Sequence, residues 1–155
     1  MMVIQLSVGS FVSVINIMIH ALATVGAVSI ARRAGRRPAP WPRLHLMGVM
    51  VATVLLLMLA HTMEIVVWSL CYALVGAAPE SSELFYFAFV NYTTLGYGDV
   101  TPVREWRLTG PMAAMNGILM FGWSTAVLFE VLLKTIEHLG AIAAPGTPFG
   151  AADRG

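Results

Sequence analysis

Long runs of apolar residues with few charges dominate the hydrophobic pattern of the chain. Three runs, at about residues 3–30, 44–75 and 108–139, consist mostly of Leu, Val, Met, Ala and Ile without strict alternation. A run of about 20 apolar residues crosses the hydrocarbon core of a bilayer, and a helix satisfies its own backbone hydrogen bonds in lipid. Each run exceeds this minimum, so we expect tilt or extension past the headgroups. The pattern predicts three transmembrane helices.

A fourth apolar stretch, residues 84–92, is too short to span a membrane. Membranes tolerate such a segment as a re-entrant helix where protein surrounds it. The preceding residues 79–83 read Pro-Glu-Ser-Ser-Glu. Ser81 or Ser82 can cap the first amides of this helix, and acidic residues suit its positive end. The carboxyl end would direct partial negative charge into the protein, where it favours a cation.

Composition narrows the class of protein. Hydrophobic residues make up 58% of the 155 residues and charged residues 11%, with a mean hydropathy of +0.79. Soluble domains carry about a quarter charged residues, so we expect an integral membrane protein. The net charge of +1 and the lack of a basic stripe argue against nucleic-acid binding. The single cysteine, Cys71, excludes an intrachain disulfide and is either a small buried hydrophobe or a reactive thiol.

Charges between the apolar runs predict an orientation. Five arginines lie between the first and second runs: Arg32, Arg33, Arg36, Arg37 and Arg43. Positive charge in a short loop marks the cytoplasmic side, so the N-terminus would be outside and the C-terminus cytoplasmic in the cell membrane. A cleaved signal peptide is the alternative for residues 1–30. It would carry basic residues before its apolar run, whereas here they follow it, which favours a retained helix.

Residues 93–99 read Thr-Thr-Leu-Gly-Tyr-Gly-Asp and lie between the short stretch and the third run. Glycines on both sides of Tyr97 permit φ values that other residues resist, so successive carbonyls can point the same way. Rings of such carbonyls can replace the water shell of a potassium ion, and the potassium-channel filter is the known example of this chemistry. The sequence resembles a potassium-channel pore of the small prokaryotic type. The alternative is a glycine-rich turn between helices.

The resemblance implies an all-α tetrameric pore fold in which each chain supplies one segment of the filter. The filter would comprise Thr94, Leu95, Gly96, Tyr97 and Gly98. The Thr94 hydroxyl and the carbonyls of Leu95, Gly96 and Tyr97 would bind K⁺ as the permeant ion, with no other cofactor. The resemblance also implies selectivity for potassium over sodium, because Tyr97 is present where non-selective relatives often lack it.

Two departures from the family concern the support of this filter. Leu95 replaces a common valine without changing the number of carbonyls, and Val90 stands where some bacterial channels have a glutamate. Valine cannot hydrogen-bond Asp99. Tyr86 occupies the position of a tryptophan that often holds the equivalent aspartate, so its hydroxyl is expected to do so here. The expected filter-support residues are Tyr86, Val90, Thr93 and Asp99.

The third apolar run extends the resemblance. Gly117 matches the glycine that commonly serves as a gating hinge, with Gly122 second; close helix packing is the alternative for both. The same alignment places the following residues along the inner cavity: Ile118, Phe121, Thr125 and Ala126. Glu130 would either form an anionic ring at the inner mouth or pair with Lys134 at i+4.

His61 and Glu64 lie three residues apart in the second run and resemble half of a metal site. A metalloprotease would need a second histidine, which is absent. A polar contact is the favoured interpretation, with Asn91, Asn116 and Ser124 as available partners, and histidine protonation could tune a gate. The remaining histidines are expected to lie alone: His20, His45 and His138.

The predicted organisation is an N-terminal transmembrane helix (1–31), a basic cytoplasmic loop (32–43), a pore domain (44–139) and a disordered tail (140–155), with no soluble regulatory domain. No helix with arginines spaced for voltage sensing is present. The expected function is a potassium-selective homotetrameric channel in the lipid bilayer. Alternatives are a weakly selective cation channel, a non-conducting subunit of another channel, or a membrane enzyme using His61 and Glu64.

Overall fold

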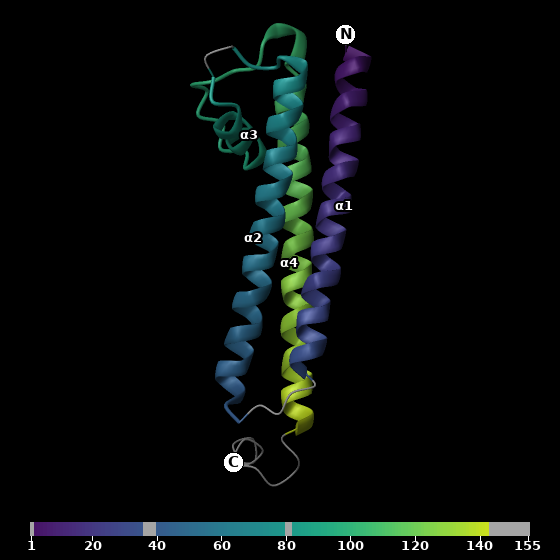
Figure 1. Ribbon diagram of the computed structural model, residues 1–155, viewed down its shortest axis with the longest axis vertical. Coiled ribbons are helices and arrows are strands. Elements are labelled where there is room, and N and C mark those ends of the chain that lie inside the picture. Colours follow the sequence, from purple (N-terminus) through teal and green to yellow (C-terminus); the bar gives the residue numbers. More distant parts are fainter. Residues whose placement is uncertain (1, 36–39, 80–81, 143–155) are drawn as a thin grey trace, which may run out of the picture.

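Three long helices lie side by side along most of the molecule (Figure 1). The computed structural model describes residues 2–35, 40–79 and 82–142. The long helices are α1 (Met2–Gly35), α2 (Pro42–Val75) and α4 (Thr109–Ile142), each of 34 residues. All three are long and apolar enough to cross a membrane. The prediction of an all-α membrane protein with three spans is therefore confirmed.

The short helix α3 (Leu84–Tyr92) lies beside one end of α2 and α4 and packs against both (Figure 1). Its bounds are those predicted from the sequence. The chain then passes through the 93–99 loop and a 3-10 turn (Arg104–Trp106) into α4. Ser82 does not cap α3: Glu83 takes the N-cap position, without a side-chain cap hydrogen bond, and the Ser82 amide donates to the Pro79 carbonyl in the preceding turn. Ser81 lies outside the described residues.

An aromatic core joins α3 to α2. Trp68 and Tyr72 of α2 and Phe87 and Tyr92 of α3 are almost wholly buried. Ring centroids are 5.8 Å apart for Trp68 and Tyr72, and 4.9 Å apart for Tyr72 and Phe87. Tilted aromatic pairs at such separations add to the stabilisation that comes from burial alone. The core therefore holds the short helix, and with it the start of the 93–99 loop, against the long helices.

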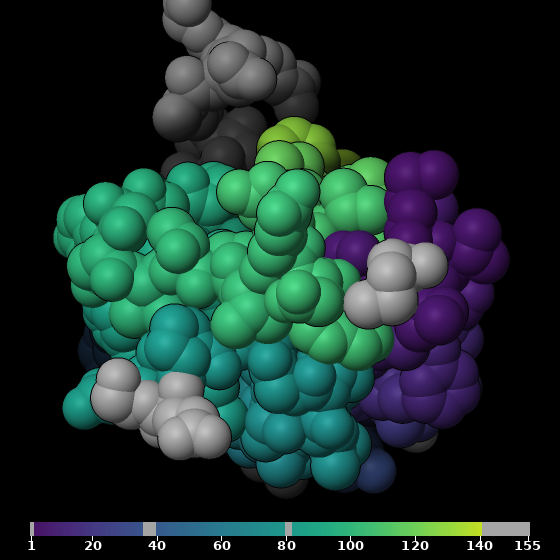
Figure 2. Space-filling view, turned by 90° about the horizontal axis from the view of Figure 1, so that it is seen from above, coloured from purple at the N-terminus to yellow at the C-terminus, as the bar shows by residue number. Residues whose placement is uncertain are grey.

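Helix α1 lies on the side of the bundle away from α3 and contacts α2 and α4 (Figures 1 and 2). One stripe of α1 is buried, and its residues are spaced by three or four: Gln5, Gly9, Val12, Asn16, His20, Ala23, Ala27 and Ala31. This spacing puts them on one helix face. Four of the eight are glycine or alanine, which let membrane helices approach closely. The first helix is thus an integral part of the bundle.

Two of the expected boundaries were wrong. Helix α1 continues through Arg32 and Arg33 to Gly35, because arginine is a good helix former, so the basic loop does not begin at residue 32. Helix α4 continues to Ile142, so residues 140–142 are helical rather than part of a tail. The remaining tail residues, 143–155, lie outside the described part of the chain, as do Arg36 and Arg37.

Candidate functional site

The backbone of the 93–99 loop alternates between left-handed and ordinary conformations. The φ angles of Thr94, Gly96 and Gly98 are 62°, 59° and 80°, whereas Leu95 and Tyr97 between them are not in the positive-φ region. A β-branched residue such as threonine rarely adopts a positive φ. In a strand of uniform conformation successive carbonyls point to opposite sides, and alternation of handedness turns them to the same side. The loop can therefore present a row of carbonyl oxygens.

Backbone hydrogen bonds hold the start of this loop against the end of α3. The amide of Leu95 donates to the Val90 carbonyl at 3.0 Å, and the amide of Thr94 donates to the Asn91 carbonyl at 3.0 Å. The Thr93 hydroxyl donates to the Phe89 carbonyl at 2.8 Å. Val90 thus contacts the loop through its main chain, which any residue could supply, and its lack of a carboxylate leaves this contact intact.

The far end of the loop is held by the Tyr86–Asp99 contact that the family resemblance implied. The Tyr86 hydroxyl donates to Asp99 Oδ2 at 2.7 Å, and the Val100 amide donates to Asp99 Oδ1 at 3.1 Å. The Tyr86 hydrogen bond lowers the pKa of Asp99 below its ordinary value. The same hydrogen bond raises the pKa of Tyr86. A cavity of about 450 Å³ lies against this pair, between the start of α3 and the returning chain. That this pair supports conduction stays a prediction.

The 93–99 loop is open on one side of the single chain. Residues 94–99 are all exposed, with Leu95 53% and Tyr97 68% accessible. One chain therefore forms one wall of any ion site in this loop, and cannot surround an ion.

Gly117 allows α4 to pass directly against the end of α3. A Cβ atom at this position would overlap the carbonyl oxygen of Tyr92 and lie 3.0 Å from its carbonyl carbon. Gly122 has no heavy atom within 4 Å of the corresponding position. The sequence suggested the same two roles, hinge or close packing, for both glycines. Close packing explains the need for glycine at position 117 but not at position 122. A hinge role for either stays a prediction.

The other residues expected along the inner cavity are exposed in the single chain: Ile118, Phe121, Thr125, Ala126 and Glu130. Lys134 Nζ lies 2.6 Å from Glu130 Oε1. Both side chains are about half exposed, so the pair adds little to stability. The i+4 partner considered for Glu130 is therefore present, and the proposed anionic ring stays a prediction.

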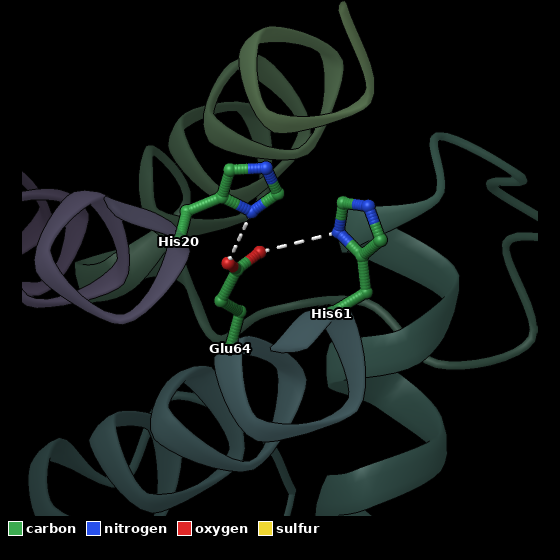
Figure 3. A group of neighbouring side chains, drawn as sticks. All are labelled: His20, His61 and Glu64. Atoms are coloured by element: carbon green, nitrogen blue, oxygen red, sulfur yellow. Dashed lines mark hydrogen bonds and ion pairs between the residues drawn. The ribbon is translucent and has the colours of Figure 1, made fainter. Parts of the chain in front are cut away.

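A buried polar cluster joins α1, α2, α3 and α4. Glu64 Oε1 lies 2.9 Å from His20 Nδ1, and Glu64 Oε2 lies 3.3 Å from His61 Nδ1 (Figure 3). The Tyr92 hydroxyl donates to Glu64 Oε2. Ser124 Oγ lies 2.9 Å from His61 Nε2 and 3.3 Å from His20 Nε2. Of the three partners considered for His61 and Glu64, Ser124 is the one that lies within hydrogen-bond distance of His61.

The expectation that His20 lies alone was wrong. Its partner Glu64 is 44 residues away in sequence, and both side chains are fully buried. The signal that could have revealed this contact is the regular stripe of small and polar residues along α1, which indicates a packed face rather than a lipid-facing one.

A second polar contact fastens α1 to α4 beside this cluster. Asn116 Oδ1 accepts from Asn16 Nδ2 at 2.7 Å and from Trp68 Nε1 at 3.1 Å. Asn116 therefore accepts hydrogen bonds from Asn16 of α1 and from Trp68, and these take the place of the contact considered with His61. Asn91, the other partner considered, lies beside Gly110. At the end of the bundle nearest the 93–99 loop, the Leu108 amide donates to Gln5 Oε1 at 2.9 Å.

Residues 51–134, which run from α2 through α3 and the 93–99 loop into α4, match a protein family described as ion channel. The chain belongs to this ion channel family. Comparison with curated proteins and with solved structures gives no match. The matched segment of this ion channel contains the 93–99 loop, Gly117 and Glu130, and excludes α1. Family membership also favours a transport role for the chain over the membrane-enzyme interpretation of His61 and Glu64.

Proposed function

We propose that the protein is a potassium-selective channel in which four chains surround one conduction path. The observation that carries the proposal is the alternating handedness of Thr94, Gly96 and Gly98 in the loop between α3 and α4. Carbonyls facing one side can replace the hydration shell of K⁺. Thr94 hydroxyls and the carbonyls of Leu95, Gly96 and Tyr97 then bind K⁺ as the transported ion.

The proposed assembly is a homotetramer with the 93–99 loops at its centre. The exposure of Leu95 and Tyr97 in one chain supports this, because a filter segment and its side chains need neighbours on the open side. A single copy of the loop per chain requires closed symmetry to form a ring. The carboxyl end of α3, which directs partial negative charge toward the same centre, favours a cation there.

The proposed orientation places the arginine-bearing end of the bundle in the cytoplasm of a cell-membrane channel. Arg32 and Arg33 lie in the last turn of α1, and Arg43 lies in the first turn of α2. Positive charge near the ends of membrane helices favours the cytoplasmic side. The 93–99 loop then opens to the outside, and Glu130 lies toward the cytoplasmic mouth.

The test is the reversal potential of purified protein in bilayers under opposed potassium and sodium gradients. We expect the reversal potential to follow the potassium gradient. Gly96→Ala should abolish selective current, because the φ of 59° at this position is unfavourable for alanine. Gly48→Ala is the matched control, since it lies in α2 with no heavy atom within 4 Å and should conduct as wild type.

Three results would contradict the proposal. A reversal potential midway between the two gradients would indicate a weakly selective cation channel. Folded tetramers that carry no current in liposomes would indicate a non-conducting subunit. A mass measurement giving an oligomer other than four chains would refute the assembly, independently of the selectivity.

A further inference from the structure

The residues of the buried cluster, which are not among those of the proposed carbonyl filter, are His20, His61, Glu64, Tyr92 and Ser124. It brings nitrogen and oxygen donors from all four helices into the interior of a membrane-length bundle. Ionisable residues there are costly and mark functional sites.

The donor atoms stand at distances that suit a metal ion. One ring nitrogen of His20, one ring nitrogen of His61 and a Glu64 oxygen all lie within 4.8 Å of one another. The pairs of neighbours are separated by 2.9 Å for His20 and Glu64, 3.3 Å for His61 and Glu64, and 3.0 Å for His61 and Tyr92. Zinc binds nitrogen and oxygen at about 2.0–2.2 Å, so adjacent ligands of a tetrahedral site are about 3.3–3.6 Å apart. The three pairs lie at or slightly below this spacing, whereas the His20, His61 and Glu64 donors are up to 4.8 Å apart, so a bound ion would draw the donors in and move the Tyr92 hydroxyl away from Glu64 Oε2.

The outer nitrogens of both rings share one acceptor. Ser124 Oγ lies within hydrogen-bond distance of both His61 Nε2 and His20 Nε2. When both Nε2 atoms carry hydrogen and donate to this oxygen, both Nδ1 lone pairs face Glu64. Metal-binding histidines are usually oriented in this way, by a hydrogen bond from the ring nitrogen that does not bind the metal.

A count of hydrogens shows that the cluster, with both rings neutral, does not supply a hydrogen to every close polar contact. Two neutral imidazoles, the Tyr92 hydroxyl and the Ser124 hydroxyl supply four hydrogens. In one arrangement His20 Nδ1–H donates to Glu64, the Ser124 hydroxyl donates to His20 Nε2, and His61 Nε2–H donates to Ser124 Oγ. His61 Nδ1 then faces the Glu64 and Tyr92 oxygens without a hydrogen. If His61 Nδ1–H donates instead, His20 Nδ1 faces Glu64 Oε1 without one. These two arrangements leave one nitrogen–oxygen contact with Glu64, at 3.3 Å or 2.9 Å, without a bridging hydrogen. If both Nδ1 atoms carry hydrogen, both contacts with Glu64 are bridged, and one Nε2 contact with Ser124 Oγ, at 2.9 Å or 3.3 Å, lacks a hydrogen instead.

We propose that His20, His61 and Glu64, with the Tyr92 hydroxyl as fourth donor, form a binding site for a Zn²⁺-like transition-metal ion. Imidazole and carboxylate ligands suit such an ion. Its positive charge offsets the buried Glu64 carboxylate and fills the contact that the hydrogens leave open. A proton satisfies only one nitrogen–oxygen pair, whereas a metal ion uses all four donors that converge here.

Occupancy of this site would fasten α1 to the pore-forming segment. His20 belongs to α1, His61 and Glu64 belong to α2, and Tyr92 is the last residue of α3, directly before the 93–99 loop. The Tyr92 carbonyl also packs against Gly117 of α4. A bound metal ion is therefore expected to restrain the base of the loop. This inference does not depend on which ion the channel conducts.

The test measures metal binding by the purified full-length protein after removal of any polyhistidine tag. Protein treated with chelator is dialysed against Zn²⁺, and bound zinc is measured by elemental analysis. We expect one ion per chain in wild type, and loss of this ion in His20→Asn and in Glu64→Gln. His45→Asn is the matched control, because His45 lies near the start of α2, away from the cluster, and its substitution should leave binding unchanged. Ser124→Ala should weaken binding about 10- to 100-fold.

Two outcomes would overturn the proposal. Wild-type protein that binds no more zinc than His20→Asn would show that a proton, and not a metal ion, fills the cluster. Binding that persists in both His20→Asn and Glu64→Gln would place the metal elsewhere. If these variants fail to fold, the visible spectrum of Co²⁺ bound to wild type decides the question, since the absence of tetrahedral nitrogen–oxygen bands would contradict the assigned donors.

Discussion

Gly117→Ala provides a direct test of the packing between α4 and the end of α3. The added Cβ would overlap the Tyr92 carbonyl oxygen and lie 3.0 Å from the carbonyl carbon. Both are main-chain atoms, which cannot move aside by rotating a side chain. Any adjustment must therefore shift α4 or the last residue of α3, and with it the start of the 93–99 loop.

The expected magnitude follows from two opposing effects. Forcing an extra methyl group into a packed interior costs about 1–3 kcal/mol, and replacing glycine by alanine within a helix stabilises it by about 0.5–1 kcal/mol. We expect Gly117→Ala to be destabilised by about 1–2 kcal/mol. Gly122→Ala is the matched control, because no atom lies near its position and only the stabilisation of the helix by alanine remains. It should be unchanged or slightly stabilised.

The assay is loss of helical circular dichroism on heating in detergent, compared for wild type and the two variants at equal protein concentration. A lower unfolding midpoint for Gly117→Ala, with Gly122→Ala at or above wild type, is the expected result. Equal midpoints for all three proteins would refute the packing argument. A change in channel opening with an unchanged midpoint would instead identify Gly117 as a hinge.

Three further predictions concern polar contacts. Tyr86→Phe should destabilise the loop at pH 7, because the variant lacks the hydrogen bond that lowers the pKa of Asp99. The difference in stability between variant and wild type should shrink as the pH falls below about 3.9, where Asp99 becomes protonated, and thermal unfolding midpoints measured across pH check this. Glu130→Gln should reduce single-channel current or block by internal cations in bilayer recordings, with no change in stability, because its pair is exposed. Asn116→Ala should lower stability by about 1–2 kcal/mol in thermal unfolding, because Trp68 and a second donor lose their acceptor.

The number of helices and the place of the 93–99 loop could be read from the sequence because they depend on local properties. Apolar length alone indicates a membrane span. The bounds of α3 follow from a short apolar stretch between polar residues on one side and the Thr-Thr-Leu-Gly run on the other. Gly96 and Gly98 likewise predict positive φ angles, and both residues have them in the structure. The contact of Tyr86 with Asp99, 13 residues apart, was expected from the family resemblance rather than from local pattern.

The arrangement of helices around the buried cluster was decided only by tertiary structure. His20 and Ser124 are 104 residues apart, and no periodicity within either apolar run indicates that the two helices meet at that height. A histidine in a membrane span needs a partner because lipid offers none. Which residue supplies that partner depends on the rotation and axial position of each helix. Those are set by close packing, at Gly117 against Tyr92 and along the buried stripe of α1. The stripe indicates which face of α1 is packed, but the sequence does not indicate which residues of the other helices lie against it.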